Sequence, residues 1–335
     1  GIEPHRTQRP RASWAPARAA PLPRAELQDA EASHATGLAP DLPALLRERA
    51  ARGLEGLAQR IEPQARWDDL VLPAAQLAQL RQLASCRRLG ARVLDDWGFR
   101  AKSARGLALT ALFSGPSGTG KTMAAEILAR ELCDDGGAGG GERAALALYR
   151  VDLAAMVSKY IGETQKNIGR IFDAAEDSGA VLLFDEGEAL FARRSAEVKD
   201  SHDRHANSET SYLLQRLESY SGIAIVTTNL RMAVDEAFLR RFRAVIDFPF
   251  PDAAQRAQIW QAVLPPELPR EDIDHQALAR LAVSGGFIRS IALTAAWLAA
   301  EDGGVLRMAH LERAARQEYM KLGKPLSESE LRGFR

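Results

Sequence analysis

The amino-acid sequence predicts an α/β fold, a parallel sheet flanked by helices and followed by a smaller all-helical domain. Three observations support this prediction. Short apolar runs typical of strands buried on both faces alternate with helical patterns, a glycine-rich segment follows the first run, and strand patterns end after Pro251. The runs are LALTALF, ALALYRVDL, AVLLFDE, GIAIVTTN and AVIDFPF. Such alternation is typical of doubly wound sheets, which bind phosphates beyond the carboxyl ends of their strands.

Length and composition limit the classes of protein that fit. The chain has 335 residues, enough for two domains, and 44 basic side chains balance 44 acidic ones. A neutral chain has no basic field to concentrate nucleic acid or anionic membrane, so both are disfavoured as partners. Cys86 and Cys133 are too few for a disulfide framework, and no apolar run reaches the roughly 20 residues that span a bilayer. We expect a cytoplasmic protein without membrane insertion, and the opening Gly1 suggests a preceding segment.

Composition also divides the chain. Seven of the sixteen prolines precede residue 44, among Ala and Arg, and such a stretch cannot repay the entropy of ordering. The run GGAGGG, Gly136–Gly141, predicts a flexible surface insertion. The expected parts are a disordered linker (1–43), a short helical segment (44–65), the α/β domain (66–251), the helical domain (252–325) and a tail (326–335).

The segment GPSGTGKT, residues 115–122, matches the P-loop pattern G-x-x-x-x-G-K-[ST] between a predicted strand and a predicted helix. Its glycines allow backbone N–H groups to converge on phosphates, Lys121 reaches the β and γ phosphates, and Thr122 offers a hydroxyl to magnesium. These features predict the fold of a P-loop NTPase. The alternative is a glycine-rich turn that fits the pattern by accident. The expected nucleotide-binding residues here are Gly115, Pro116, Ser117, Gly118, Thr119, Gly120, Lys121, Thr122 and Met123.

The segment VLLFDEGEAL places two acids where a buried strand ends. Asp185 is a candidate for the magnesium shell together with Thr122, and Glu186 is a candidate for polarising the attacking water. The alternative is an ordinary strand end with solvated acids. A phosphate loop followed by such a pair predicts nucleotide hydrolysis with Mg²⁺.

Three further segments complete a resemblance. Together with the phosphate loop and the paired acids, SKYIGETQKNIGRIF, VTTN and DEAFLRRFR resemble the AAA+ ATPase family, in its protein-remodelling subgroup, over about residues 66–325. The stretch from VLLFDEGEALF through RRSAEVKDSHDRHAN to YLLQRLE is also similar to bacterial AAA ATPases associated with phage-tail-like contractile injection systems. The resemblance implies that the helical domain is a lid domain over the nucleotide.

The resemblance also implies roles for single residues. Asn229 would help to place the hydrolytic water, and Arg240 and Arg241 would be arginine fingers that reach the site of a neighbouring subunit. For the two arginines the alternative is a basic helix end that balances the carbonyl dipole. Arg289 corresponds to a second sensor arginine on the lid, with a surface salt bridge as the alternative.

Two segments depart from the family pattern. WDDLVLP resembles the segment over the adenine and makes Asp69 and Leu70 candidate contacts, although the glycine common after the aspartates is absent. Glu188 follows Gly187 where relatives often have Ala and then Asp, so the role of Glu188 stays open.

The tract Lys159, Tyr160 and Ile161 is similar to a loop that faces the central channel of a ring, where an aromatic side chain grips a polypeptide. The alternative is that Tyr160 packs near the start of a helix. Gly162 next to it allows a mobile loop.

The resemblance therefore implies an ATP-hydrolysing motor, a homo-hexamer that remodels, unfolds or disassembles a protein substrate through a ring pore. One alternative is an AAA+ ATPase of the loader type that acts on nucleic acid, which the neutral charge disfavours. Another is a nucleotide-dependent assembly scaffold, which the intact Asp185, Glu186, Asn229 and Arg240 disfavour. The substrate, any adaptor and the role of Gly136–Gly141 are not predicted.

Overall fold

The computed structural model describes residues 42–102, 108–132, 146–159, 163–176, 178–188, 201–229 and 236–321, and also 323, 326, 327, 330 and 334. The insertion predicted at Gly136–Gly141 lies outside these residues. Residues 1–41 of the predicted linker also lie outside them. Helix α2 (Leu42–Leu54) already includes the last two residues that the sequence analysis gave to the linker.

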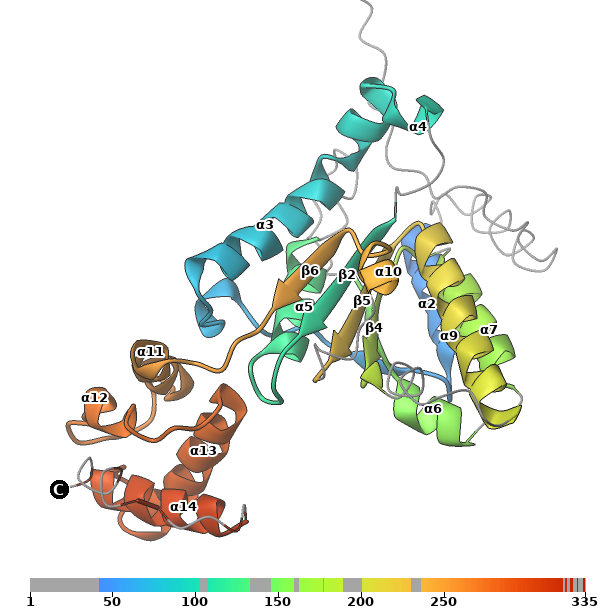
Figure 1. Cartoon of the computed structure of the whole chain (residues 1–335). Helices are drawn as coiled ribbons and strands as arrows, with labels where there is room; N and C mark the ends of the chain where they lie inside the picture. Colours follow the sequence, from blue (N-terminus) through green and yellow to red (C-terminus); the bar gives the residue numbers. More distant parts are fainter. Residues whose placement is uncertain are drawn as a thin grey trace, which may run out of the picture.

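The sheet has six strands in the order β1-β3-β4-β5-β2-β6 (Figure 1). Its five parallel strands overlap the five predicted apolar runs, which confirms the predicted fold class. β2 lies between β5 and β6, not beside β3, the next strand in the sequence. The connections therefore cross over, as doubly wound sheets require. The parallel strands are β2 (Leu109–Ser114), β3 (Leu148–Asp152), β4 (Val181–Asp185), β5 (Ile223–Thr228) and β6 (Ala244–Asp247).

A sixth strand makes the sheet mixed. β1 (Gln59–Ile61) pairs antiparallel with β3 at the edge of the sheet. The sequence analysis expected only a helical segment over 44–65, because QRI has no apolar run and its first two residues are exposed. This strand forms through its pairing with β3, so the segment 44–65 is joined to the sheet.

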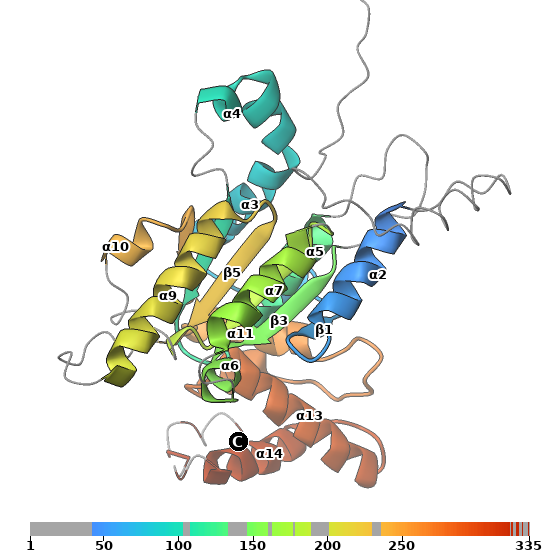
Figure 2. The ribbon, with the colours of Figure 1, turned by 90° about the vertical axis from the view of Figure 1, so that its right-hand side faces the viewer.

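Helices cover both faces of the sheet (Figures 1 and 2). Side chains from α2, α6, α7 and α9 share one apolar core with the sheet, and side chains from α3 and α5 share the other. The helices of the first core are α2, α6 (Leu153–Lys159), α7 (Thr164–Glu176) and α9 (Ser201–Ser219), and those of the second are α3 (Ala74–Arg88) and α5 (Lys121–Glu131).

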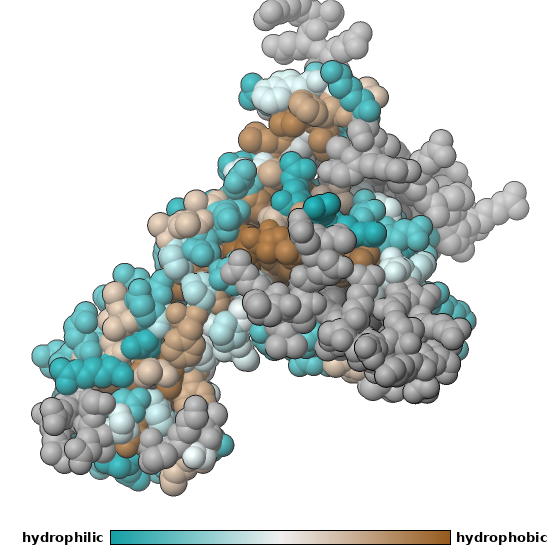
Figure 3. All heavy atoms as spheres, in the orientation of Figure 1, coloured by the Kyte–Doolittle hydropathy of each residue, from teal (hydrophilic) through white to brown (hydrophobic). Residues whose placement is uncertain are grey.

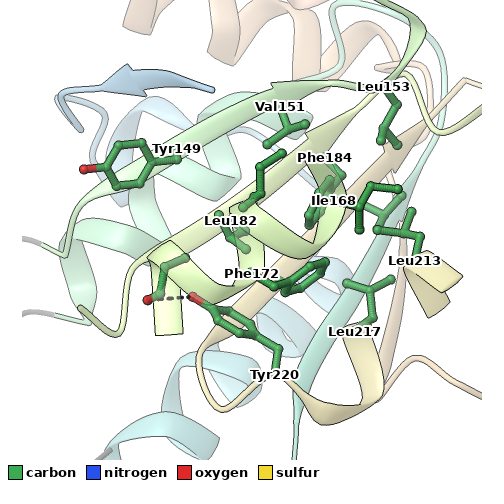
Figure 4. Close-up of a cluster of buried hydrophobic side chains, with 14 of the residues drawn as sticks. Tyr149, Val151, Leu153, Ile168, Phe172, Leu182, Phe184, Leu213, Leu217 and Tyr220 are labelled. Atoms are coloured by element: carbon green, nitrogen blue, oxygen red, sulfur yellow. Dashed lines mark hydrogen bonds between the residues drawn. The ribbon is translucent and has the colours of Figure 1, made fainter. Parts of the chain in front are cut away.

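The two cores divide the side chains of each central strand. In β4, Leu182 and Phe184 belong to the first core, whereas Val181 and Leu183 belong to the second, as the period of two along a strand requires. Phe172 stacks on Phe184 with 5.4 Å between the ring centroids (Figure 4). Because β4 is apolar on both faces, its register is fixed. The residue after its last apolar position therefore lies where the carboxyl ends of the parallel strands meet, which we call the carboxyl edge.

The hydroxyl of Tyr220 lies inside the first core. The Tyr220 hydroxyl donates a hydrogen bond to the Ala180 carbonyl at 2.7 Å, just before β4 (Figure 4). Burial raises the pKa of Tyr220, so this hydroxyl keeps its proton and remains a donor.

Only helices follow β6 among the described elements. They form a group of their own beside the sheet domain (Figure 1). Their side chains pack around Trp260, which is fully buried, in a third apolar core. The Tyr319 hydroxyl donates to Glu330 Oε1 at 2.7 Å, so part of the predicted tail folds back onto this domain. The helices of this domain, which we call the lid, are α11 (Ala253–Val263), α12 (His275–Leu278), α13 (Gly285–Glu301) and α14 (Met308–Lys321).

The segment after α3 projects away from the sheet as an arm, formed by the π-helical turn η2 (Ala91–Asp96) and by α4 (Phe99–Lys102) (Figure 1). Apolar surface gathers on this part of the molecule (Figure 3), where Leu89, Trp97 and Phe99 are exposed. Over the described parts of the chain, no helix is both long and apolar enough to cross a membrane.

Candidate nucleotide-binding and catalytic site

Three segments with predicted chemistry meet at the carboxyl edge of the sheet. The phosphate loop follows β2, the paired acids end and follow β4, and Asn229 follows β5 (Figure 1). Because β5 lies between β2 and β4, and the three strands are parallel, these segments are neighbours in space. The buried strands therefore bring together residues that are more than a hundred positions apart in the sequence.

The phosphate loop has a backbone that only glycine tolerates at its start. Gly115 has φ 145°, and a Cβ there would lie 2.1 Å from the Phe248 carbonyl oxygen. Gly120, with φ 100°, is the N-cap of α5, and a Cβ there would lie 2.9 Å from Leu70 Cδ1. The loop is thus packed against the chain on two sides while its N–H groups lead into a helix N-terminus, the geometry that binds phosphate.

Lys121 is folded back into the loop. Its Nζ donates to the Gly115 carbonyl at 2.6 Å, the Pro116 carbonyl at 2.9 Å and Asn229 Oδ1 at 2.8 Å. Only 8% of the residue is exposed. Burial lowers the pKa of Lys121, and the charges of Asp185 and Glu188 oppose this shift. All three ammonium protons have protein acceptors, so a bound phosphate must replace at least one of them.

Asp185 is held by two side chains of neighbouring strands. Arg150 of β3 approaches Asp185 Oδ2 with Nη2 at 2.6 Å and Nε at 2.9 Å, and the Thr227 hydroxyl of β5 donates to Oδ1. The guanidinium holds one carboxylate oxygen and the Thr227 hydroxyl holds the other, so together they fix both the place and the plane of the carboxylate. Arg150 is not among the residues predicted from the sequence, although an arginine inside an apolar run is a visible signal.

Glu186 adopts a left-handed backbone with φ 59°, uncommon for a residue other than glycine, and its side chain is exposed. Its N–H donates to Asp185 Oδ1 at 3.2 Å. A strained backbone at this position turns the Glu186 side chain away from the sheet core and towards solvent at the carboxyl edge. An exposed carboxylate at this edge can meet a water molecule next to bound phosphates.

The residues proposed for magnesium fit that ion. Thr122 lies in the first turn of α5, half-buried, and Asp185 ends β4 at the same edge. A hydroxyl and a carboxylate are oxygen donors, and Mg²⁺ takes few protein ligands because it keeps waters and substrate phosphates. Over the described positions, no group of three or more His, Cys, Asp or Glu could hold a metal ion.

Asn229 is held from both ends of its amide. Its Oδ1 accepts from Lys121, its Nδ2 donates to Glu188 Oε1 at 2.8 Å, and its backbone N–H donates to Glu188 Oε2 at 3.3 Å. The structure therefore places Asn229 beside the phosphate loop. It also gives Glu188, whose role the sequence left open, a definite contact.

The segment predicted to cover the adenine borders the phosphate loop. Leu70 is buried in the second core and reaches Gly120, whereas the Asp69 carboxylate accepts from the Arg66 N–H at 2.7 Å. The lid touches the loop as well, because the Gly286 N–H at the start of α13 donates to the Gly118 carbonyl at 2.9 Å. Arg289 is exposed one turn further along α13.

Arg240 and Arg241 lie away from the other candidates. The Thr110 hydroxyl donates to the Arg241 carbonyl at 3.1 Å, and Thr110 is the second residue of β2, whereas the phosphate loop follows the last. At a rise of about 3.3 Å per residue, the two ends of this strand are about 13 Å apart. Both arginines are exposed, and Arg241 Nη1 is 3.2 Å from Glu218 Oε1 of α9. The structure therefore does not bring these arginines to the phosphate loop of their own chain.

Lys159 is the last residue of α6, which follows β3 directly. Tyr160 and Ile161, the other residues of the predicted pore loop, lie outside the described residues.

Residues 111–250 match the family model described as "ATPase family associated with various cellular activities (AAA)". An uncharacterized AAA family ATPase, y4kL, from Sinorhizobium fredii is 34% identical over 196 residues, which are 58% of this chain and 53% of that protein. A proteasome-activating nucleotidase from Methanopyrus kandleri is 30% identical over 207 residues, 59% of this chain and 44% of the relative. A proteasome-associated ATPase from Saccharomonospora viridis is 27% identical over 231 residues, 64% and 36% of the two chains.

The matched region thus spans about half or less of the length of these curated relatives. Among solved structures, the FIGL-1 AAA domain matches with a TM-score of 0.56 and 21% identity, and covers 88% of this chain and 93% of that chain. This likeness shows the fold. The phosphate loop, the paired acids and Asn229 stand at one sheet edge inside the matched residues, and residues 111–250 accordingly belong to an ATPase domain of the AAA family.

Proposed function

We propose that this chain hydrolyses ATP with Mg²⁺ as a subunit of a cytoplasmic hexameric ring, and that hydrolysis remodels, unfolds or disassembles a protein substrate. The observation that carries the proposal is the separation of the two arginines from the phosphate loop. One edge of the sheet holds the phosphate loop, Asp185, Glu186 and Asn229, and the opposite edge holds Arg240 and Arg241.

At the carboxyl edge, each residue has a part in hydrolysis. The N–H groups of the loop and Lys121 bind the phosphates and neutralise their charge. Thr122 and Asp185 would hold Mg²⁺, which when bound neutralises charge on the phosphate oxygens. Glu186 accepts a proton from the attacking water, and Asn229 orients that water by hydrogen bonding. The products are ADP and phosphate.

The opposite edge, where the parallel strands begin, is called the amino edge here. At this edge, Arg240 and Arg241 are exposed and can reach a second copy of the chain. A guanidinium next to the γ phosphate neutralises charge that develops as the phosphoryl group transfers. Since both arginines are remote from their own phosphate loop, this help comes from the neighbouring subunit. A contact that joins unlike edges of two copies is heterologous, and it closes into a ring when the rotation between copies allows it.

The protein substrate is supported by the relatives and by the connections of the sheet. Two relatives are named for the proteasome, as activating nucleotidase and as associated ATPase. In this chain, Arg150 of β3 contacts Asp185, and β3 leads through α6 to Lys159, Tyr160 and Ile161. A change in the position of Asp185 at the carboxyl edge can therefore be transmitted through β3 and α6 to the segment proposed to grip a polypeptide.

Mixed rings test the shared site. One partner is Lys121→Ala, which has a defective phosphate loop and intact arginines, and the other carries Arg240→Ala with Arg241→Ala. In a random equal mixture, about one heterologous interface in four pairs an intact loop with intact arginines. We expect each variant alone to be nearly inactive and the mixture to recover part of the ATP turnover.

The matched control mixes Lys121→Ala with Glu186→Gln, because both defects lie in the carboxyl edge and no interface then has an intact site. Co-purification through two different affinity tags shows that the copies assemble. If the arginine mixture stays as inactive as the control mixture while the copies co-purify, the site is not shared between subunits and the proposal fails.

A further inference from the structure

Glu188 contacts the residue proposed to orient the attacking water. One carboxylate oxygen accepts from Asn229 Nδ2 at 2.8 Å and the other accepts from the Asn229 backbone N–H at 3.3 Å. A carboxylate that binds both the side chain and the backbone of one residue fixes the torsions between them. This pair is separate from the phosphate-binding pattern and from the two acids that end and follow β4.

The chain is built so that Glu188 reaches this position. Glu186 has the left-handed backbone described above, and the Gly187 N–H then donates to the Thr227 carbonyl at 2.8 Å. The turn after β4 is therefore tied to β5. Glu188 follows directly and lies beside Asn229, the first residue beyond β5.

The two contacts of the Asn229 amide define its orientation. An ammonium group only donates hydrogen bonds and a carboxylate only accepts them. The oxygen of the amide therefore faces Lys121 and its nitrogen faces Glu188. The amide nitrogen has two N–H groups, and Glu188 uses one of them, while the other has no recorded acceptor within the part of the chain that the structure describes.

We propose that Glu188 is a positioning residue for ATP hydrolysis, which sets the orientation of the Asn229 amide at the carboxyl edge of the sheet. The inference rests on the proposed function. The last torsion of an asparagine side chain is broad, so an amide held by Lys121 alone loses a defined N–H direction when a phosphate takes Lys121 away. A misplacement of about 1 Å can lower a rate by about a hundredfold.

Steady-state ATP turnover tests the effect on the reaction. Glu188→Ala removes both acceptors, and we expect kcat to fall at least about tenfold while KM for ATP changes less than about threefold. Glu188→Gln retains one acceptor for Asn229 Nδ2, so it is expected to restore much of kcat. Glu267→Ala, which removes an exposed carboxylate on the lid, is the matched control. Thermal melting of each variant shows whether it folds.

Two kinetic outcomes overturn the inference. One is a wild-type kcat in Glu188→Ala. The other is a fall in kcat that accompanies a lower melting temperature and that Glu188→Gln does not relieve, because such a fall reflects the loss of a structural contact.

A spectroscopic readout does not depend on turnover. The chain contains three asparagines, Asn167, Asn207 and Asn229, so selective ¹⁵N labelling of asparagine yields three side-chain amide signals. Asn229→Ser identifies the signal of Asn229 by its loss. In the nucleotide-free chain, we expect Glu188→Ala to shift the Asn229 amide protons upfield, since a hydrogen bond to a carboxylate is removed, and to leave the other two signals in place.

The two experiments separate the possible failures. An unshifted Asn229 signal in Glu188→Ala overturns the contact itself and with it the inference, even if the wild type hydrolyses ATP. A wild type without any ATP turnover overturns the proposed function and the positioning role together. A shifted signal combined with a kcat loss that Glu188→Gln relieves supports the inference.

Discussion

At the carboxyl edge of the sheet, Lys121, Asp185 and Asn229 are each fixed by contacts from a different strand or loop, most of them shorter than 3.0 Å. At the amino edge, Arg241 meets Glu218 in a pair whose side chains are 43% and 49% exposed. Exposed ion pairs contribute between about 0 and 1 kcal/mol, and salt screens them. One edge is thus organised within the chain before any ligand arrives, and the other presents groups to whatever lies outside it.

This difference has a physical reason. Groups that stabilise a transition state act best when they are fixed in advance, because they then need no reorganisation during the reaction. A guanidinium that enters the site of another subunit must keep contact while the two subunits move. The comparison of the two edges predicts that substitutions at the carboxyl edge have large effects and that substitutions around the arginines' own contacts have small ones.

The largest expected effect is that of Glu186→Gln. An amide is isosteric with the carboxylate but cannot accept the proton of water, so ATP turnover is expected to fall about a thousandfold. Affinity for ATP should stay close to wild type, because Lys121 and Asp185 are unchanged. Turnover and the equilibrium binding of a fluorescent ATP analogue measure the two properties. Wild-type turnover in this variant would remove Glu186 from the mechanism.

The packing of the phosphate loop predicts the next effect. In Gly115→Ala, the new Cβ would lie 2.1 Å from the Phe248 carbonyl oxygen at φ 145°, so the loop or the backbone just after β6 must shift. We expect the free energy of unfolding to fall by roughly 2–4 kcal/mol, together with a loss of ATP binding. Urea unfolding measures the change.

Gly303→Ala is the matched control for this prediction. Gly303 also has a positive φ, 82°, but apart from its chain neighbours no described residue has an atom within 4 Å of a Cβ there. Its cost is therefore backbone strain alone, roughly 1–2 kcal/mol. If Gly115→Ala cost no more than Gly303→Ala, the loop would be free to move, and the carboxyl edge would not be as rigid as its contacts imply.

The sequence predicted the five parallel strands because each is an apolar run buried on both faces, a property written into consecutive residues. It did not predict β1, because Gln59–Ile61 has no such run and becomes a strand only through β3. The same distinction holds for the site. The spacing of the phosphate loop identifies Lys121 and Thr122, whereas the contacts of Arg150 and Glu188 depend on the order of strands in space, which no local pattern encodes.

The tract that follows α6 gives a third prediction, which separates hydrolysis from work on a substrate. Tyr160→Ala removes an aromatic ring proposed to grip a polypeptide but leaves the carboxyl edge intact. We expect unfolding of a protein substrate to fall at least about tenfold, much more than ATP turnover falls. Tyr160→Phe should retain most of the unfolding, because the ring supplies the contact area.

The measurement for Tyr160 needs a substrate, which can be trapped on Glu186→Gln rings in ATP and then followed by its loss of fluorescence or of structure. Equal unfolding rates in Tyr160→Ala and wild type would show that this tract does not grip the substrate. The carboxyl edge would then drive unfolding through a different segment of the chain.

The smallest effect is expected at the amino edge, and it is the sharpest test of the comparison. Glu218→Ala removes the partner of Arg241, and we expect the free energy of unfolding to change by less than about 1 kcal/mol, because the pair is exposed. If the neighbouring subunit fixes Arg241 during the reaction, ATP turnover of Glu218→Ala should stay within about twofold of wild type. A turnover as low as that of Arg241→Ala would mean that Glu218 holds the guanidinium in place as Arg150 holds Asp185. The amino edge would then be organised within the chain as well, and the contrast between the two edges would fail.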